Sequence, residues 1–339
     1  MKKIFFLALM ILIFGIPVQG FSQVTKVGTT AAGFLNIDVG ARAIGMGSAY
    51  VSSADDATAM YWNPSGIANV DNNEAVFTHN RWIADMSFNF AGIVVPLSFG
   101  TIGAGATFLT MDDMERTTVE YPDGNGELFS AGAYAFNLTY ARRLTDRFNI
   151  GGNVKYIHEF IYNSSASGLA FDVGTQFITQ FNGLRIGMNI SNFGTKMRMS
   201  GRDLILQVDT NPIIAGNNEN INAELKTEAY DLPLLFRVGM SMDVLKGMGD
   251  SNLIIAVDAL HPNDDVEFIN LGGMYLFRNM FSLSAGYKTL FAEDSEEGIA
   301  MGAGFYYSLI SGLRIKLNYA YQDFGVLSEI QQFTVALEF

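Results

Sequence analysis

Three histidines are the side chains of this chain best suited to act as general bases or metal ligands near neutral pH. His79, His158 and His261 stand far apart and share no spacing, and the chain contains no cysteine. No serine stands with a histidine in a recognisable hydrolase motif. This pattern indicates neither a zinc site nor a Ser-His-Asp triad, so we expect no catalytic residue, no metal and no cofactor.

An acidic motif, Asp258–Asp265 (DALHPNDD), is the next candidate for chemistry. The carboxylates of Asp258, Asp264 and Asp265 are oxygen ligands of the kind that calcium prefers. The ligand spacing of an EF-hand is absent, however, and the Pro-Asn pair favours a tight turn. We therefore expect an outside loop here rather than a calcium site.

Two glycines, Gly45 and Gly47, resemble part of a phosphate-binding loop. That chemistry requires a preceding strand within a βαβ unit. The rest of the chain predicts a β-barrel, which contains no such unit. The more economical interpretation is that these glycines allow the backbone to pack closely inside a narrow space.

The composition limits the kind of protein in which these residues act. The chain of 339 residues is 49% hydrophobic and only 16% charged, against roughly 25% charged in soluble domains. Transmembrane helices need runs of about 20 apolar residues, but after the N-terminus the longest runs are as short as GIVVPL and LIIAV. Apolar residues without apolar runs predict transmembrane β-strands, in which every second residue faces lipid.

The first 22 residues are expected to be a secretory signal peptide. Lys2 and Lys3 precede the apolar stretch Ile4–Ile16, and small residues follow at Gly20 and Ser22. The whole chain carries a net charge of −13, and removal of the two lysines makes the mature protein more acidic still. A chain this acidic repels nucleic acid, so no nucleic-acid partner is expected.

Alternation of apolar and polar residues dominates from about residue 74 onward. In Leu313–Tyr321, for example, the leucine, isoleucine and tyrosine side chains share one face, and Arg314 and Lys316 lie on the other. The pattern predicts an all-β protein, a transmembrane antiparallel barrel of about 14 strands. A further hairpin within 194–229 would change that count. The predicted strands are 74–83, 85–97, 100–111, 128–143, 147–161, 167–180, 184–193, 230–245, 251–260, 265–277, 281–291, 298–309, 313–323 and 330–339.

Every second connection between these strands is short, as expected when short periplasmic turns alternate with longer outside loops. The chain then ends in an amphipathic strand with an aromatic C-terminal residue. Phe333, Val335, Leu337 and Phe339 share one face of this strand. This ending resembles the assembly signal that the barrel insertion machinery of the bacterial outer membrane reads.

Residues 23–73 do not alternate, and we expect them to form a separate segment before the barrel at 74–339. Ser53, followed three residues later by Asp56, forms a capping-box pattern that predicts the start of a short helix. Pro64 predicts its end near Trp62, because a residue before proline avoids the helical region.

The string FLNIDVGARAIGMGSAYVSSADDATAMYWNPSGIA, residues 34–68, closely resembles the N-terminal signature of the PorV/PorQ family of outer-membrane proteins. DDMERTT, FGTKMRMSG and DALHPNDD follow in the order that the family shows. The resemblance implies a FadL-like barrel associated with type IX secretion, located in the bacterial outer membrane. It also implies that residues 23–73 fold inward as a hatch that plugs the lumen, with Asn63-Pro64 matching the Asn-Pro of that hatch.

The expected strand faces direct six cations toward the lumen: Lys155, Arg185, Arg237, Lys288, Arg314 and Lys316. The hatch segment carries carboxylates at Asp38, Asp55 and Asp56. A charge in the lumen needs a partner or water, so some of these cations are expected to hold the hatch through its carboxylates. The alternative is that they only line a wet pore.

Three functions remain open at this stage. The first is a type IX secretion component that binds or shuttles secreted proteins, with outside loops 111–128 and 194–229 contacting the translocon and the C-terminal domains of cargo. The second is a FadL-like transporter of a hydrophobic small molecule. The third is an enzyme at the barrel rim, which no motif supports. Composition and periodicity do not separate the first two functions, and only the family resemblance favours secretion.

Overall fold

The computed structural model describes residues 27–209, 220–246, 249–292, 295–309 and 312–339. The expected signal peptide, residues 1–22, lies outside the described residues. Within those ranges, none of the helices has the length and apolar character needed to span a membrane.

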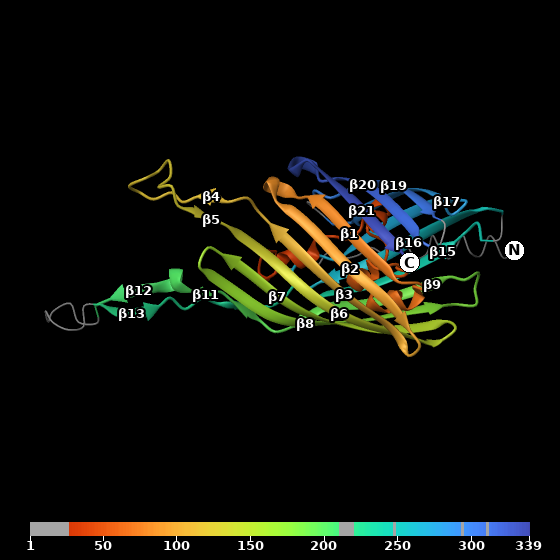
Figure 1. Cartoon of the computed structure of the whole chain (residues 1–339), viewed down its shortest axis with the longest axis horizontal. Coiled ribbons are helices and arrows are strands. Elements are labelled where there is room, and N and C mark those ends of the chain that lie inside the picture. The colour runs from red at the N-terminus through yellow and green to blue at the C-terminus, as the bar shows by residue number, and fades with distance from the viewer. Residues whose placement is uncertain (1–26, 210–219, 247–248, 293–294, 310–311) are drawn as a thin grey trace.

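Fourteen antiparallel strands of the described chain close into a barrel (Figure 1). β1 pairs with both β2 and the last strand, β21, which closes the ring, and the prediction of fourteen strands is confirmed. The barrel strands are β1 Glu74–Arg81, β2 Ser87–Leu97, β3 Gly100–Thr110, β6 Ala131–Thr145, β7 Phe148–Ile161, β8 Ser164–Ile178, β9 Arg185–Gly194, β15 Leu235–Asp243, β16 Ser251–Pro262, β17 Phe268–Phe277, β18 Phe281–Leu290, β19 Ile299–Ser308, β20 Arg314–Asp323 and β21 Glu329–Glu338.

One strand boundary differs clearly from the prediction. The range 230–245 begins too early, because β15 starts at Leu235, two residues after Pro233. Proline has no N–H to donate to a sheet, and the residues before it, β14 (Ala229–Tyr230), pair instead with β10 (Met197–Arg198).

Two long connections project beyond one end of the barrel (Figure 1). The first carries β4 (Met114–Glu115) and β5 (Leu128–Phe129), and the second carries β12 (Ile205–Val208) and β13 (Ile221–Glu224). A hairpin within 194–229 therefore exists, but β12 and β13 form their own two-stranded sheet. The barrel consequently keeps its fourteen strands.

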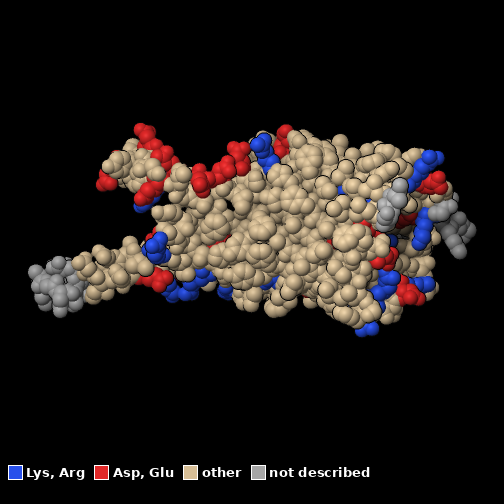
Figure 2. All heavy atoms as spheres, viewed as in Figure 1, with Lys and Arg blue, Asp and Glu red and all other residues tan. Residues whose placement is uncertain are grey.

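The outer surface of the barrel has a broad band without charge. Along β21, exposed and buried residues alternate over most of the strand, so Phe333 and Val335 face outward while Gln332 and Thr334 are buried. In the view of Figure 2, the charged side chains gather toward the two ends of the molecule, and most of the surface between them is uncharged. This distribution suits a barrel surrounded by lipid.

The N-terminal segment, residues 27–73, contains four short helical elements: η1 Gly33–Asn36, α2 Ala41–Gly45, α3 Ala59–Trp62 and η2 Pro64–Asn69. Trp62 and Tyr50 are among its largest fully buried side chains. Because residues of the segment and of many barrel strands belong to one cluster of buried side chains, the core of the protein lies inside the barrel.

The predicted capping box at Ser53 is wrong. The Ser53 hydroxyl donates to the Tyr50 carbonyl, and helix α3 begins only at Ala59. Asp56 instead accepts hydrogen bonds from the backbone N–H and the hydroxyl of Thr58, which close a turn before the helix. The helix ends at Trp62, as the proline two residues later predicts.

Candidate functional site

The segment lies so close to the barrel wall that glycines are required at the contact. Gly47 has a φ of +60°, and a Cβ built there would lie 2.5 Å from the Tyr287 backbone nitrogen and 2.7 Å from the Leu271 oxygen. A Cβ at Gly45 would lie 2.8 Å from the Cα of Gly302. Gly45 and Gly47 thus place the backbone of the segment directly against β17, β18 and β19.

A second close contact is formed by Asn63 and Pro64. The Asn63 amide donates to the Val51 carbonyl at 2.9 Å and to the Thr175 carbonyl of β8 at 3.0 Å. A Cβ built at Gly151 of β7 would lie 2.5 Å from the Pro64 carbonyl carbon. The Asn-Pro pair therefore fixes the segment to β7 and β8, on strands distant from the first contact.

Polar side chains of the wall hold the backbone of the segment between these contacts. The buried Asp258 carboxylate accepts from the backbone N–H groups of Tyr50 at 2.7 Å and Val51 at 2.8 Å. Gln176 donates to the Ala54 carbonyl at 2.8 Å, and Gln332 donates to the Asp38 carbonyl at 3.1 Å. Such bonds satisfy backbone groups that have no partner within the short helices.

The interpretation of the whole DALHPNDD motif as an outside loop is therefore wrong, whereas the predicted strand 251–260, which contains Asp258, is confirmed. Asp258 lies within β16, fully buried, because the alternation of that strand continues into the first residues of the DALHPNDD motif. Of the three aspartates of the motif, only Asp264 and Asp265 lie in the connection after β16. Among the described residues, no group of three or more histidine, aspartate or glutamate side chains is placed to hold a metal ion.

An ion cluster joins the segment to the wall at the end with the long connections. The Lys288 ammonium lies 2.8 Å from Asp38 Oδ2 and 2.6 Å from Glu297 Oε1. Burial raises the pKa of the Asp38 carboxyl, but Lys288 and Arg237 more than offset this, so its pKa lies below the ordinary value. Burial raises the pKa of Glu297, and Lys288 only partly opposes that shift.

A second ion cluster lies at the opposite end. Arg42 Nη1 of the segment is 2.7 Å from Asp55 Oδ1 and 3.2 Å from Asp56 Oδ2, and Arg185 of β9 is 3.8 Å from Asp55 Oδ2. Burial raises the pKa of Asp55, but the two guanidinium groups lower it further than burial raises it. The sequence analysis missed Arg42, because the segment has no periodicity from which a buried position can be recognised.

The remaining predicted cations lie inside the barrel with other partners. Lys155 is buried beside Asp172 of the wall, with the two charges 2.7 Å apart. Lys316 pairs with Glu74 at 2.5 Å and Glu338 at 3.0 Å. Arg314 donates to the Asn279 carbonyl at 3.0 Å. Of the six cations, Lys288 and Arg185 are thus the two that the structure places within 4 Å of segment carboxylates among the described residues.

Two cavities border the N-terminal segment. One has a volume of about 690 Å³ and is lined by Asp38, Trp62, Arg237 and Lys288 together with residues of three shorter connections, 263–267, 291–298 and 324–328, at the same end of the barrel as the long ones. The other, of about 310 Å³, is lined by Gly40, the Arg42 ion cluster and residues near the short turns. We call them the outer and inner cavity, after the long connections and the short turns respectively.

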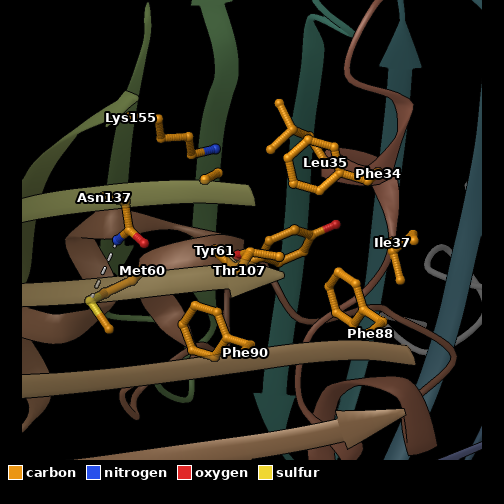
Figure 3. Close-up of a pocket in the computed structure, with 11 residues that line it drawn as sticks. Phe34, Leu35, Ile37, Met60, Tyr61, Phe88, Phe90, Thr107, Asn137 and Lys155 are labelled. Carbon is orange, nitrogen blue, oxygen red and sulfur yellow. Dashed lines mark hydrogen bonds between the residues drawn. The ribbon is translucent and has the colours of Figure 1, made fainter. Parts of the chain in front are cut away.

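A third pocket lies between the segment and the wall, where side chains of η1 and α3 approach β2, β3, β6 and β7 (Figure 3). Phe34, Leu35, Tyr61, Phe88 and Phe90 make it largely apolar. Its volume is only about 20 Å³, which is room for about one water molecule. Side chains of the segment therefore fill nearly all the space between it and this part of the wall.

The family model described as "Type IX secretion system protein PorV" matches residues 21–221, more than half of the chain. The chain belongs to this family. It is a type IX secretion barrel of the bacterial outer membrane, and its band of outward apolar side chains contacts lipid. Comparison with curated proteins found no significant match.

Solved structures support the fold assignment. The chain is similar to the CymD monoaromatic hydrocarbon channel (12% identity, TM-score 0.57), to the Pseudomonas putida toluene transporter TodX (11%, 0.55) and to a Pseudomonas aeruginosa FadL homologue (12%, 0.53). Each comparison covers 88% of this chain and 96 to 97% of the other. At these identities the likeness shows a FadL-like fold alone. Membership of a secretion family indicates a non-enzymatic protein.

The outer-membrane location assigns the two ends of this PorV-family barrel. Short turns face the periplasm and long connections face outward in such barrels, so the outer cavity opens toward the cell exterior. Phe333, Val335, Leu337 and Phe339 are all exposed on one face of the C-terminal strand. They lie beside β1, whose start pairs with the end of β21.

Proposed function

We propose that this barrel binds secreted proteins at the cell surface through its two projecting connections while residues 23–73 act as a hatch that closes the lumen. In this proposal residues 1–22 are removed as a signal peptide and residues 74–339 form the barrel. The observation that carries it is the PorV family match, combined with the two connections that extend outward from the barrel.

The surfaces of these connections suit a protein partner. On one face of the β12–β13 hairpin, Leu206, Val208 and Ile221 are all exposed and lie side by side in the strand register. The β4–β5 connection carries six acidic residues and one arginine, with Val119 and Tyr121 exposed among them. Exposed apolar groups beside polar ones are typical of interaction sites. Cargo C-terminal domains and the type IX translocon are the partners proposed here, and the barrel insertion machinery is proposed to read the C-terminal strand.

The proposed hatch is supported by its contacts. It contacts β17 and β18 at Gly47 and β19 at Gly45, and it is hydrogen-bonded to β8 at Asn63 and to β16 at Asp258. The outer and inner cavities lie on different sides of it. A hatch held in this way keeps small molecules from leaking through the barrel while large cargo is handled outside.

The test is deletion of the gene, followed by complementation and comparison of secreted proteins. The wild-type barrel is expected to restore secretion, and a variant with residues 204–225 replaced by a Gly-Ser linker is expected to insert normally but to secrete less. Replacement of residues 83–85, in the shorter outside connection between β1 and β2, by Gly-Ser serves as the control. Unchanged secretion after complete deletion would rule out the secretion role.

The alternative function is FadL-like transport of a hydrophobic small molecule. The observation that favours it is the outer cavity, whose wall includes Leu235, Leu260, Phe268 and Phe324. The pocket of Figure 3 opposes it, since a ligand can enter there only if the segment moves. Normal secretion combined with lost uptake of a lipophilic compound in the deletion strain would favour transport over secretion.

A further inference from the structure

Arg237 is a buried cation that makes no direct ion pair with a described carboxylate; Asp38 and Asp258 interact with it only from a greater distance. Its side chain belongs to β15, is only 4% exposed and lines the outer cavity. No described carboxylate oxygen lies within 4.0 Å of it, its Nε has no hydrogen-bond partner, and its one hydrogen bond runs from Nη2 to the Tyr61 hydroxyl at 3.5 Å. Lys288, which lines the same cavity, has two carboxylates within 2.8 Å.

A buried charge without a direct ion pair is costly unless water or a ligand completes its hydrogen bonds. The guanidinium carbon lies 5.2 Å from the ring centre of Tyr61 and 5.0 Å from that of Trp62. These cation–π contacts hold the group in place but leave most of its hydrogen-bonding capacity unused. A guanidinium presents donors in a fork whose geometry matches a carboxylate bidentately, so a carboxylate is the chemical group that fits best.

The cavity around Arg237 indicates which kind of carboxylate. Its volume of about 690 Å³ is within the range of ligand sites, roughly 300 to 1,000 Å³. Leu235, Leu260 and Phe268 form apolar wall, while Asp264, Asp265 and Glu296 line the part formed by the outside connections. None of these three acids has a described cation within 4.0 Å. A simple fatty-acid anion meets repulsion on entry, whereas a ligand with positive charges next to its carboxylate is complementary to both regions.

We propose that Arg237 binds the C-terminal carboxylate of a secreted protein whose last residues include lysine or arginine. The chain end enters the outer cavity from the cell surface, its carboxylate pairs with Arg237, and its basic side chains face Asp264, Asp265 and Glu296. This inference rests on the proposed function, because it assigns to cargo recognition a site at the same end of the barrel as the projecting connections.

Binding of a defined peptide to the full-length barrel in detergent tests the site. The probe is a fluorescent decapeptide of alternating valine and threonine that ends in two lysines and a free carboxylate, compared with the same peptide as a C-terminal amide. For the wild type we expect the acid to bind at least about tenfold more tightly than the amide, a difference of about 1.4 kcal/mol. Arg237→Gln is expected to reduce that ratio to about one, and Arg237→Lys to leave it intermediate. Arg147→Gln, at an exposed periplasmic turn, is the control that keeps the full ratio.

Three results would overturn the inference: equal binding of acid and amide to the wild type, an acid preference that persists in Arg237→Gln, or complete displacement of the peptide by dodecanoate at equal concentration. The last would assign the site to small lipophilic carboxylates.

Folding of each variant is checked by heat-modifiable migration in gels. Failure of the proposed function is seen separately, as normal secretion in the deletion strain, whereas failure of this inference is seen as an acid-to-amide ratio of one in a barrel that still supports secretion.

Discussion

Lys288 of strand β18 and Asp38 of the N-terminal segment form an ion pair of 2.8 Å, in which both side chains are nearly removed from solvent. This pair joins the part of the chain that precedes the barrel to a strand near its end. Since Asp258, Gln176 and Gln332 hold the segment through its backbone, this pair is a place where a single side-chain change can weaken its contact with the wall.

Loss of one partner of this pair is expected to be more harmful than loss of both. Lys288→Met leaves the Asp38 carboxylate buried without its main counter-charge, which costs roughly 3 to 5 kcal/mol for a buried pair. The double variant Lys288→Met/Asp38→Asn removes both charges and should recover part of that loss. Thermal unfolding in detergent measures the difference, and Arg116→Gln, which breaks an exposed pair with Glu127, should change little. A double variant no more stable than Lys288→Met would contradict this account.

The Arg42 ion cluster gives a prediction about closure of the lumen. Asp55→Asn together with Asp56→Asn leaves Arg42 without its two carboxylate partners. We expect the segment to detach, so that trypsin cuts after Arg42 and single-barrel conductance in planar bilayers rises. The exposed change Asp71→Asn is the control. Unchanged protease resistance and conductance in the double variant would mean that these charges only line a wet lumen.

The fourteen strands were predictable because lipid and lumen impose opposite demands on alternate residues. That pattern extends even to Asp258, which occupies an inward position of β16. The predicted strand 251–260 already contained Asp258, but the turn residues that follow it made the motif as a whole look like an outside loop. The segment offered no comparable signal. Short helices held by the wall follow no period, which is why the start of α3 and the role of Arg42 emerged only from the structure.

Gly47 provides a test of the close contact between segment and wall. Gly47→Ala imposes a left-handed conformation on a residue with a Cβ, at a cost of about 1 to 2 kcal/mol, and also places that atom 2.5 Å from the Tyr287 nitrogen. Gly28→Ala is a matched control, since its φ is +75° but nothing lies within 4 Å of its Cβ. Trypsin cleavage after Arg42 should therefore accelerate in Gly47→Ala and remain near the wild-type rate in Gly28→Ala. Equal rates in the two variants would show that the backbone contact is not needed.

Acid should loosen the segment. The pKa values of Asp38 and Asp55 are lower in the folded protein than their ordinary value of 3.8. Their stabilisation is therefore fully present above that value and is lost as the pH falls through the lowered pKa values. We expect channel conductance to remain low from pH 7 to about pH 4 and to increase below that. Asp38→Asn should reduce this dependence on acid, and a conductance that rises already between pH 7 and pH 5 would point to other groups.

The C-terminal residue is expected to matter for assembly more than for the folded state. Phe339 lies outside β21, is 53% exposed, and donates its backbone N–H to the Asn73 carbonyl at 2.9 Å, beside the seam where β21 meets β1. Its ring buries little surface, so Phe339→Ser should change the thermal stability of the assembled barrel only slightly. If the insertion machinery reads an aromatic C-terminal residue, the same substitution should lower the amount of barrel in the outer membrane several-fold.

The control is Phe277→Ser, because Phe277 is also an exposed phenylalanine near a periplasmic turn. It distinguishes a general loss of apolar surface from loss of the assembly signal. Equal membrane levels for Phe339→Ser and wild type would remove the assembly role of this residue.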